Sequence, residues 1–222
     1  MNGLLLHPLF KPAAGLLALG PFLWLAYAAV TDPGLHLGAN PAETLIRETG
    51  EMTLRLLCAT LAITPLRHWT GWHALARLRR MLGLCAFFYG VVHFLCFAWL
   101  DMGLDLQAIV VDIVKRPFIL VGTAALLGML PLAATSFNRA IKALGARRWQ
   151  LLHRSVYAVA GLGLLHFFWM RAGKNDFADV VVYAAILAGL LGWRGWRKLQ
   201  ALRPGTSASR PKAPSTDRFQ GK

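Results

Sequence analysis

The stretch MLGLCAFFYGVVHFLCFAWL, residues 81–100, decides the fold class. It is 20 residues long and contains no Lys, Arg, Asp or Glu. An α-helix rises about 1.5 Å per residue, so this stretch spans about 30 Å, the thickness of the hydrocarbon core of a bilayer. The sequence therefore predicts a membrane-spanning helix that carries one imidazole, that of His93, in its interior.

Composition extends this prediction to the whole chain. Of the 222 residues, 56% are hydrophobic and 15% are charged, whereas soluble domains carry about 25% charged residues. Six segments are apolar enough to cross a bilayer, although Arg55 makes the second the weakest. They are 13–30, 49–66, 81–100, 117–135, 151–170 and 177–196. We therefore predict an all-α membrane protein, a six-helix transmembrane bundle.

The predicted organisation has three parts. Residues 1–12 form a cytoplasmic N-terminus, and residues 13–196 form the helical transmembrane domain. Residues 197–222 form a basic tail with too few apolar side chains to build a core, and we expect it to be disordered. The three cysteines lie in apolar segments without Cys-x-x-Cys spacing, so we interpret them as buried thiols.

The charged residues predict an orientation. With the N-terminus inside, most Lys and Arg residues fall in cytoplasmic segments, whereas nine of the ten acids fall in outer loops. Because Lys and Arg near helix ends are retained on the cytoplasmic side, both termini should be cytoplasmic. Topology and contact with anionic lipid then account for the net charge of +14, and nucleic acid is not an expected partner.

The seven histidines differ in their position relative to the membrane. His93, His153 and His166 lie inside apolar segments, where an ionisable group is costly and indicates function. Imidazole is a standard axial ligand of haem iron, and a haem between two helices takes one histidine from each. The other four are interpreted as interfacial or solvated side chains: His7, His36, His68 and His73.

Depth predicts which histidines pair. At about 1.5 Å per residue, His166 lies roughly 8 Å from the outer helix end at Arg171, and His93 lies roughly 12 Å from Asp101. These two should therefore hold the same iron. His153 lies roughly 20 Å of helix from His166, near the cytoplasmic face, which predicts a second site. The spacing turns a regular helix by roughly 220°, so the two rings would point the same way only if the helix were distorted.

Several separate motifs occur in an order that resembles one known family. They are Arg79-Arg80-Met81-Leu82-Gly83-Leu84, Phe87-Phe88-Tyr89 with His93, Lys115-Arg116-Pro117, Leu132-Ala133-Ala134-Thr135-Ser136, and Leu144-Gly145 leading through Arg148-Trp149-Gln150-Leu151-Leu152-His153 to His166. Over residues 15–195 the chain resembles the MsrQ family of haem-binding membrane subunits, which is related to ferric reductase and NADPH oxidase transmembrane domains.

The resemblance implies a ferric reductase-like bundle in the bacterial inner membrane that binds one or two b-type haems, with FMN as a further cofactor. It implies iron ligation by His93, His166 and His153. Electrons would pass from membrane quinones or a cytoplasmic flavin reductase to a periplasmic molybdopterin-containing methionine sulfoxide reductase. That separate protein would be the catalytic subunit and would repair oxidised periplasmic proteins.

Two features differ from the related oxidases. Those proteins carry two histidines in each of two helices, whereas the third segment here has only His93, with Arg79 fourteen positions earlier. Arg79 and Arg80 are candidates for binding haem propionates or flavin phosphate, or else they are basic anchors at the cytoplasmic interface. The oxidases also append FAD and nicotinamide domains, and we expect this chain to receive its electrons from a separate donor.

Other interpretations remain open. The chain could be a stand-alone ferric or oxygen reductase with an open haem position, or a non-redox helical scaffold in which the histidines only pack. Lys115-Arg116-Pro117 fits a helix start, because proline at the first position costs little, or a basic contact for a periplasmic partner. A haem spectrum of the purified protein distinguishes the scaffold from both redox functions. Electron delivery to a periplasmic reductase then distinguishes the electron-transfer subunit from the stand-alone reductase.

The charge distribution makes the topology testable. Reporter fusions after Gly145 and after Arg203 should be cytoplasmic, and a fusion after Gly173 should be periplasmic, because the basic segments remain inside. Paired alkaline phosphatase and fluorescent-protein reporters measure this. Reversed activities would overturn the orientation and the outward direction of electron flow.

Overall fold

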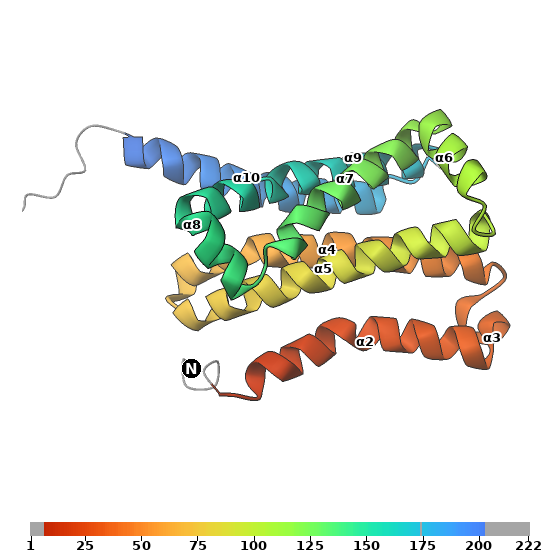
Figure 1. Ribbon diagram of the computed structural model, residues 1–222, viewed down its shortest axis with the longest axis horizontal. Coiled ribbons are helices and arrows are strands. Elements are labelled where there is room, and N and C mark those ends of the chain that lie inside the picture. The colour runs from red at the N-terminus through yellow and green to blue at the C-terminus, as the bar shows by residue number, and fades with distance from the viewer. Residues whose placement is uncertain (1–6, 174, 203–222) are drawn as a thin grey trace, which may run out of the picture.

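The computed structural model describes residues 7–173 and 175–202, and these contain helices without strands (Figure 1). The elements are α2 (Phe10–Thr31), α3 (Pro33–Leu37), α4 (Pro41–Thr70), the 3-10 helix η1 (His73–Leu75), α5 (Ala76–Cys96), the π-helix η2 (Phe97–Asp101), α6 (Leu106–Lys115), α7 (Pro117–Ala134), α8 (Asn138–His153), α9 (Val156–Ala172) and α10 (Ala178–Leu202). The all-α prediction is confirmed.

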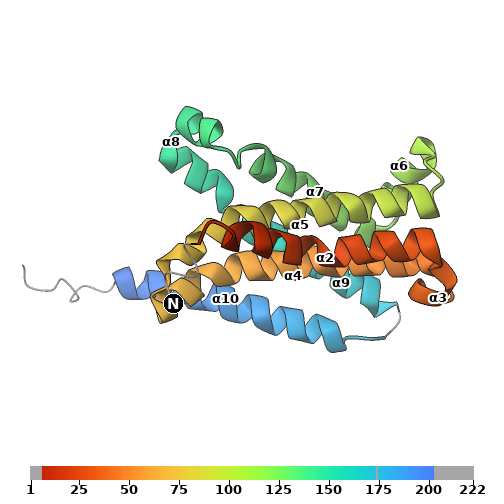
Figure 2. The same ribbon diagram turned by 90° about the horizontal axis from the view of Figure 1, so that it is seen from below.

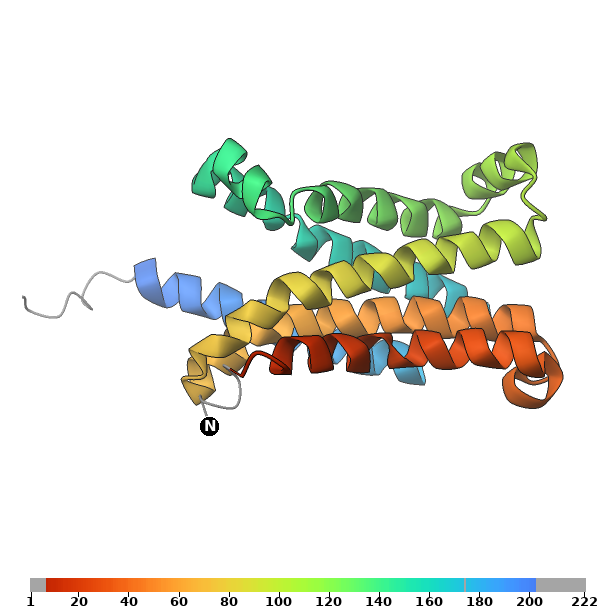
Figure 3. The same cartoon turned by 60° about the horizontal axis from the view of Figure 1, so that its bottom comes forward.

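Long helices run along the bundle in alternating directions. Five helical stretches are long and apolar enough to cross a membrane, and α4, which contains Arg55, is not among them. Helix α4 nevertheless lies beside α5 along the bundle (Figures 1 and 3). The first residues of α2 and the last residues of α10 lie at the same end, together with α8, and α3 and α6 lie at the other. This arrangement agrees with a six-helix bundle in which α4 is the sixth crossing.

The ends of α4 follow from its sequence. The Asn40 side chain accepts a hydrogen bond from the Glu43 amide at 3.2 Å, and Pro41 occupies the first turn. Gly71 ends the helix with a φ of 70°, and its amide donates to the Arg67 carbonyl at 3.1 Å. Glycine adopts this left-handed conformation without steric cost. Helix α4 is therefore much longer than the predicted segment 49–66.

The predicted membrane segment 151–170 falls within the apolar stretch Asn138–Ala172, but the helix is interrupted at residues 154–155. Helix α8 ends at His153 and α9 begins at Val156, so the two intramembrane histidines of this region lie on different helices. Helix α8 is itself kinked at Gly145, where φ is 73°. Figure 2 shows α8 joined to α9 at the end of the bundle opposite α6.

Other boundaries also shift. Helix α10 continues to Leu202, so its last turns occupy the start of the predicted tail, and 203–222 lie outside the described residues. Helix α2 begins at Phe10, within the predicted N-terminal segment. Pro117 begins α7, as predicted, and the Arg116 guanidinium binds the Asp112 carboxylate at 2.8 Å. Arg116 therefore has an ion-pair partner within the chain itself, next to the helix start at Pro117.

Tyr89 joins α5 to α2 at a break in the helical hydrogen bonding. Its ring is fully buried, and its hydroxyl donates to the Ala18 carbonyl at 3.0 Å and accepts from the Phe22 amide at 2.9 Å. These two backbone groups are four residues apart, beside Pro21 within α2. A side chain that enters the backbone ladder stabilises a bent helix. Tyr89 therefore fixes the position of α2 against α5.

Tyr89→Phe should lower the thermal stability of the purified protein. The substitution leaves one buried amide and one buried carbonyl without their partner, which costs about 1–3 kcal/mol. Tyr27→Phe is the matched control, because Tyr27 is 55% exposed. Differential scanning fluorimetry in detergent measures both, and equal melting temperatures for the two variants would contradict the bridging role.

Candidate functional site

A cavity of about 540 Å³ lies between α4, α5, α7 and α9. Its walls are mostly apolar and aromatic, with Leu57, Phe94, Leu126 and Met129 among them. Charged side chains line the part nearest α3 and α6: Glu43, Arg47, Glu51, Asp101, Asp112, Arg116 and Arg171. A volume of this size with apolar walls and few convergent polar groups is typical of a cofactor site.

Two imidazoles face each other in this cavity. His93 comes from α5 and His166 from α9, and their ring centroids are 6.0 Å apart. The two residues lie 73 positions apart in the chain, so only the antiparallel packing of the bundle brings them together. The juxtaposition predicted from their depths is therefore present.

Backbone carbonyls orient both rings. Nδ1 of His93 lies 2.8 Å from the Ile46 carbonyl oxygen, and Nδ1 of His166 lies 2.6 Å from the Phe118 carbonyl oxygen. A carbonyl can only accept, so each Nδ1 carries the hydrogen and each Nε2 keeps its lone pair. This arrangement is typical of metal-binding histidines, whose second nitrogen is held by a carbonyl or carboxylate.

Two glycines make room for the rings. A Cβ atom at Gly50 of α4 would lie 2.9 Å from Cε1 of His93, and one at Gly122 of α7 would lie 2.7 Å from Nδ1 of His166. Real Cβ atoms do not approach other heavy atoms this closely. Each histidine ring therefore packs directly against the backbone of a neighbouring helix at a glycine. This close approach sets how far the ring projects into the cavity.

The residues fit a haem better than a bare metal ion. Imidazole nitrogens bind metals at about 2.0–2.1 Å, so an ion between two opposed rings separates their centroids by about 6 Å. The observed separation of 6.0 Å matches. In the described part of the chain no group of three or more His, Cys, Asp or Glu residues could hold a metal. Two axial imidazoles suffice for haem, because the porphyrin supplies the remaining ligands.

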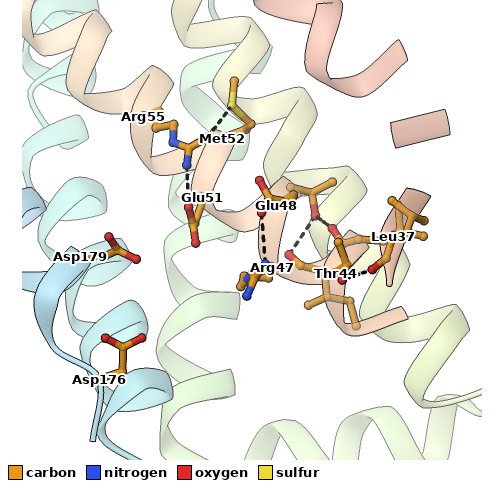
Figure 4. A network of polar contacts seen from close by, with 12 residues as sticks. Leu37, Thr44, Arg47, Glu48, Glu51, Met52, Arg55, Asp176 and Asp179 are labelled. Carbon is orange, nitrogen blue, oxygen red and sulfur yellow. Dashed lines mark hydrogen bonds and ion pairs between the residues drawn. The ribbon is translucent and has the colours of Figure 1, made fainter. Parts of the chain in front are cut away.

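A network of ion pairs centred on Arg171 lies at one end of the cavity. Arg171, at the end of α9, is 8% exposed and binds the carboxylates of Glu51 at 3.3 Å, Asp176 at 2.8 Å and Asp179 at 3.3 Å. Glu51 also binds Arg55 at 2.7 Å (Figure 4). Burial of a charge is tolerated when it is paired in this way. The network joins α4, α9 and α10 beside the two histidines.

The structure does not bring His153, Arg79 or Arg80 to this cavity. The His153 ring stacks on Trp149 with centroids 4.0 Å apart, and its Nε2 lies 3.1 Å from the Thr135 hydroxyl. The Arg79 guanidinium donates to the Thr64 hydroxyl, and Arg80 donates to Asn138 at 2.9 Å. Their predicted cofactor-binding roles stay predictions about a separate region.

Sequence reasoning missed four residues of the site: Gly50, Gly122, Glu51 and Arg171. It placed Glu51 and Arg171 in outer loops, whereas both are helical and nine-tenths buried. The available signal was that Glu51 and Arg171 lie next to apolar segments. Charged residues in a membrane helix are costly and are usually paired, so these two could have been expected to pair. No comparable signal distinguished the two glycines from the other nineteen.

Comparison with known proteins identifies relatives over most of the chain. The family model described as "Ferric reductase like transmembrane component" matches residues 49–164. The "Protein-methionine-sulfoxide reductase heme-binding subunit MsrQ" of Polaromonas naphthalenivorans (strain CJ2) is 64% identical over 86% of this chain and 86% of its own length. The protein of the same name from Ralstonia nicotianae is 55% identical over 88% and 89%. No solved structure matches significantly.

Gly122→Ala should weaken cofactor binding while the bundle still folds. The added methyl group displaces the His166 ring, which is the movable partner, and disturbs its bond to the Phe118 carbonyl. We expect at least a tenfold loss of bound haem per protein, measured by pyridine haemochrome. Gly161→Ala in α9 is the control, because a Cβ there meets nothing within 4 Å. Equal haem contents in the two variants would contradict the packing role.

Proposed function

This chain belongs to the MsrQ family of heme-binding subunits, within the ferric reductase-like transmembrane proteins, and from that premise we propose that it carries electrons through haem b. The curated relatives are named as subunits of a protein-methionine-sulfoxide reductase. The observation that carries the proposal is the pair of imidazoles, 6.0 Å apart in an apolar cavity, with both Nε2 atoms available.

In this proposal His93 and His166 would hold the haem iron. Haem supplies one-electron redox chemistry, and the protein supplies ligands, orientation and a low-dielectric surround. The Ile46 and Phe118 carbonyls hold the two imidazoles in one tautomer. Apolar side chains such as Leu57, Leu126 and Met129 line the cavity that holds the two rings. His153 is the proposed ligand of a second haem, whose other ligand the described residues do not indicate.

The direction of transfer is outward. Basic residues lie at the end of the bundle with α8, and the cavity reaches toward the opposite end, where most acids lie. We therefore place the chain in the bacterial inner membrane with both termini cytoplasmic. The acceptor is a periplasmic molybdopterin-containing methionine sulfoxide reductase that repairs oxidised proteins. Membrane quinones or a cytoplasmic flavin reductase supply the electrons.

FMN is the second proposed cofactor. Arg79 and Arg80 lie at the start of α5, at the same end of the bundle as α8. Planar guanidinium groups bind phosphate well, and these two are candidates for the flavin phosphate. Their present partners are neutral, Thr64 and Asn138, so no ion pair has to break for an anion to bind.

A stand-alone ferric or oxygen reductase is less well supported. Such an enzyme gives its substrate access to the iron or to the haem edge, and direct oxygen chemistry at the iron needs an open axial position. Here a carbonyl oxygen lies next to Nδ1 of each imidazole, and the two ring centroids are 6.0 Å apart, so both rings are available to one iron. A scaffold without redox function would not need either lone pair directed into a cavity.

His93→Ala and His166→Ala should each abolish the same low-spin haem, because the two residues hold opposite sides of one iron. The losses should not add in the double variant. Optical spectra and pyridine haemochrome of the purified variants measure this. His153→Ala is the matched control and should retain the spectrum of this haem. The pairing is wrong if either single variant of the first two keeps a full bis-imidazole spectrum.

A further inference from the structure

A second cavity, of about 260 Å³, adjoins a different face of α4 from the haem cavity. Helices α2 and α3 form its other sides, at the end of the bundle away from α8. It combines apolar, aromatic, basic and acidic side chains: Pro21, Trp24, Leu25, His36, Leu37, Thr44, Glu48, Met52 and Arg55. This cavity belongs to no part of the haem site described above.

The polar groups of this cavity suit a small hydrogen-bonding ring. The His36 ring packs against Trp24 and Tyr27, with centroids 5.5 Å and 6.0 Å away. Within the described residues no hydrogen bond engages its ring nitrogens. Glu48 offers a carboxylate that is one-third exposed and lies 3.5 Å from the Arg47 guanidinium. An aromatic surface with one imidazole and one carboxylate can stack on a ring and accept hydrogen bonds from its hydroxyl groups.

Two ion pairs connect this cavity with the haem cavity. Arg55 lines the smaller cavity and binds Glu51, which lines the larger one, at 2.7 Å. Glu48 lines the smaller cavity and binds Arg47, which lines the larger one. Figure 4 shows both pairs on α4. The two cavities are therefore separated by the thickness of one helix.

We propose that the smaller cavity binds the head group of a membrane quinol and that electrons enter the protein there. The inference rests on the proposed function, because it needs the haem between His93 and His166 as the electron acceptor. It names the donor among those considered and gives it a site formed by Trp24, His36 and Glu48.

The oxidation balances with these groups. A quinol loses two protons and two electrons and becomes a quinone, so both of its O–H bonds break. The His36 imidazole takes one proton and the Glu48 carboxylate takes the other, and both protons pass to the outer solution. The electrons leave singly, because haem iron accepts one at a time, and two ferric haem equivalents are reduced per quinol.

The charges favour a neutral head group over a phospholipid phosphate. Glu48 would repel a phosphate, and the guanidinium of Arg55 is already engaged by Glu51 at 2.7 Å and by the Tyr183 hydroxyl at 3.0 Å. A quinol carries no charge and presents two hydroxyl donors to two acceptors. The apolar side chains Pro21, Leu25 and Met52 suit its substituted ring.

The position has a consequence for energy conversion. Quinol oxidised near α3 releases its protons at the outer face, and its electrons reach the haem and then the periplasmic partner on the same side. No electron crosses the membrane on this path. Reduction by a cytoplasmic flavin would instead begin at the end of the bundle that carries His153.

The test uses the haem-loaded protein in lipid nanodiscs. A photoreactive azido-quinone should label peptides of α2 to α4 in the wild type, and a short-chain ubiquinol should reduce the haem in stopped-flow measurements. His36→Gln and Glu48→Gln should each lose the label and slow reduction by quinol at least tenfold. His73→Gln, an exposed histidine at the other end of the bundle, is the matched control. Dithionite should reduce all four proteins to the same spectrum.

Several results would overturn the inference. They are wild-type labelling and rates in both variants, labelling confined to other helices, or loss of labelling when phosphatidylglycerol is added. Failure of the proposed function gives a different result, since a wild type without haem has no spectrum to follow although its cavity can still be labelled. A haem that reduced flavin reduces and quinol does not would refute the quinol site alone.

Discussion

The hydrogen bonds from His93 and His166 to two backbone carbonyls are the constraint on which the site depends. An imidazole inside a membrane bundle must place its N–H on an acceptor, because no water is at hand. The Ile46 and Phe118 carbonyls accept those hydrogens, which leaves a lone pair on each ring. Helices α4 and α7 thus determine the chemistry of histidines that belong to α5 and α9.

Helix α4 does more than fill the bundle. It is the least apolar of the long helices in the described structure, and its polar residues are divided between two cavities. Gly50 lets the His93 ring approach, Glu51 receives Arg171 and Arg55, and Glu48 faces the smaller cavity. A purely apolar helix here would be easier to insert but could provide neither the room nor the paired charges. The weakness of α4 as a membrane segment is therefore the cost of its position between two sites.

Sequence alone predicted the features that depend on hydrophobic length and on depth along a helix. The all-α bundle and the pairing of His93 with His166 followed from apolar runs and a rise of about 1.5 Å per residue. The bend between His153 and Val156 did not, because no proline marks it and the apolar pattern runs through it. The glycine contacts and the Glu51–Arg171 pair are properties of interhelical distance, which no local pattern encodes.

The position of Arg171 bears on the redox state of the haem that we propose for this cavity. A single buried charge near a haem stabilises one oxidation state of the iron strongly, because the dielectric constant there is low. Arg171 and Glu51 are each about nine-tenths buried and lie 3.3 Å apart, so their opposite charges act against each other in the cavity. The exposed Asp176 and Asp179 carboxylates complete the pairing from the side facing solvent, where screening weakens them. The network can therefore join three helices with its buried charges paired, and the potential of the proposed haem would depend mainly on its ligands and the apolar walls.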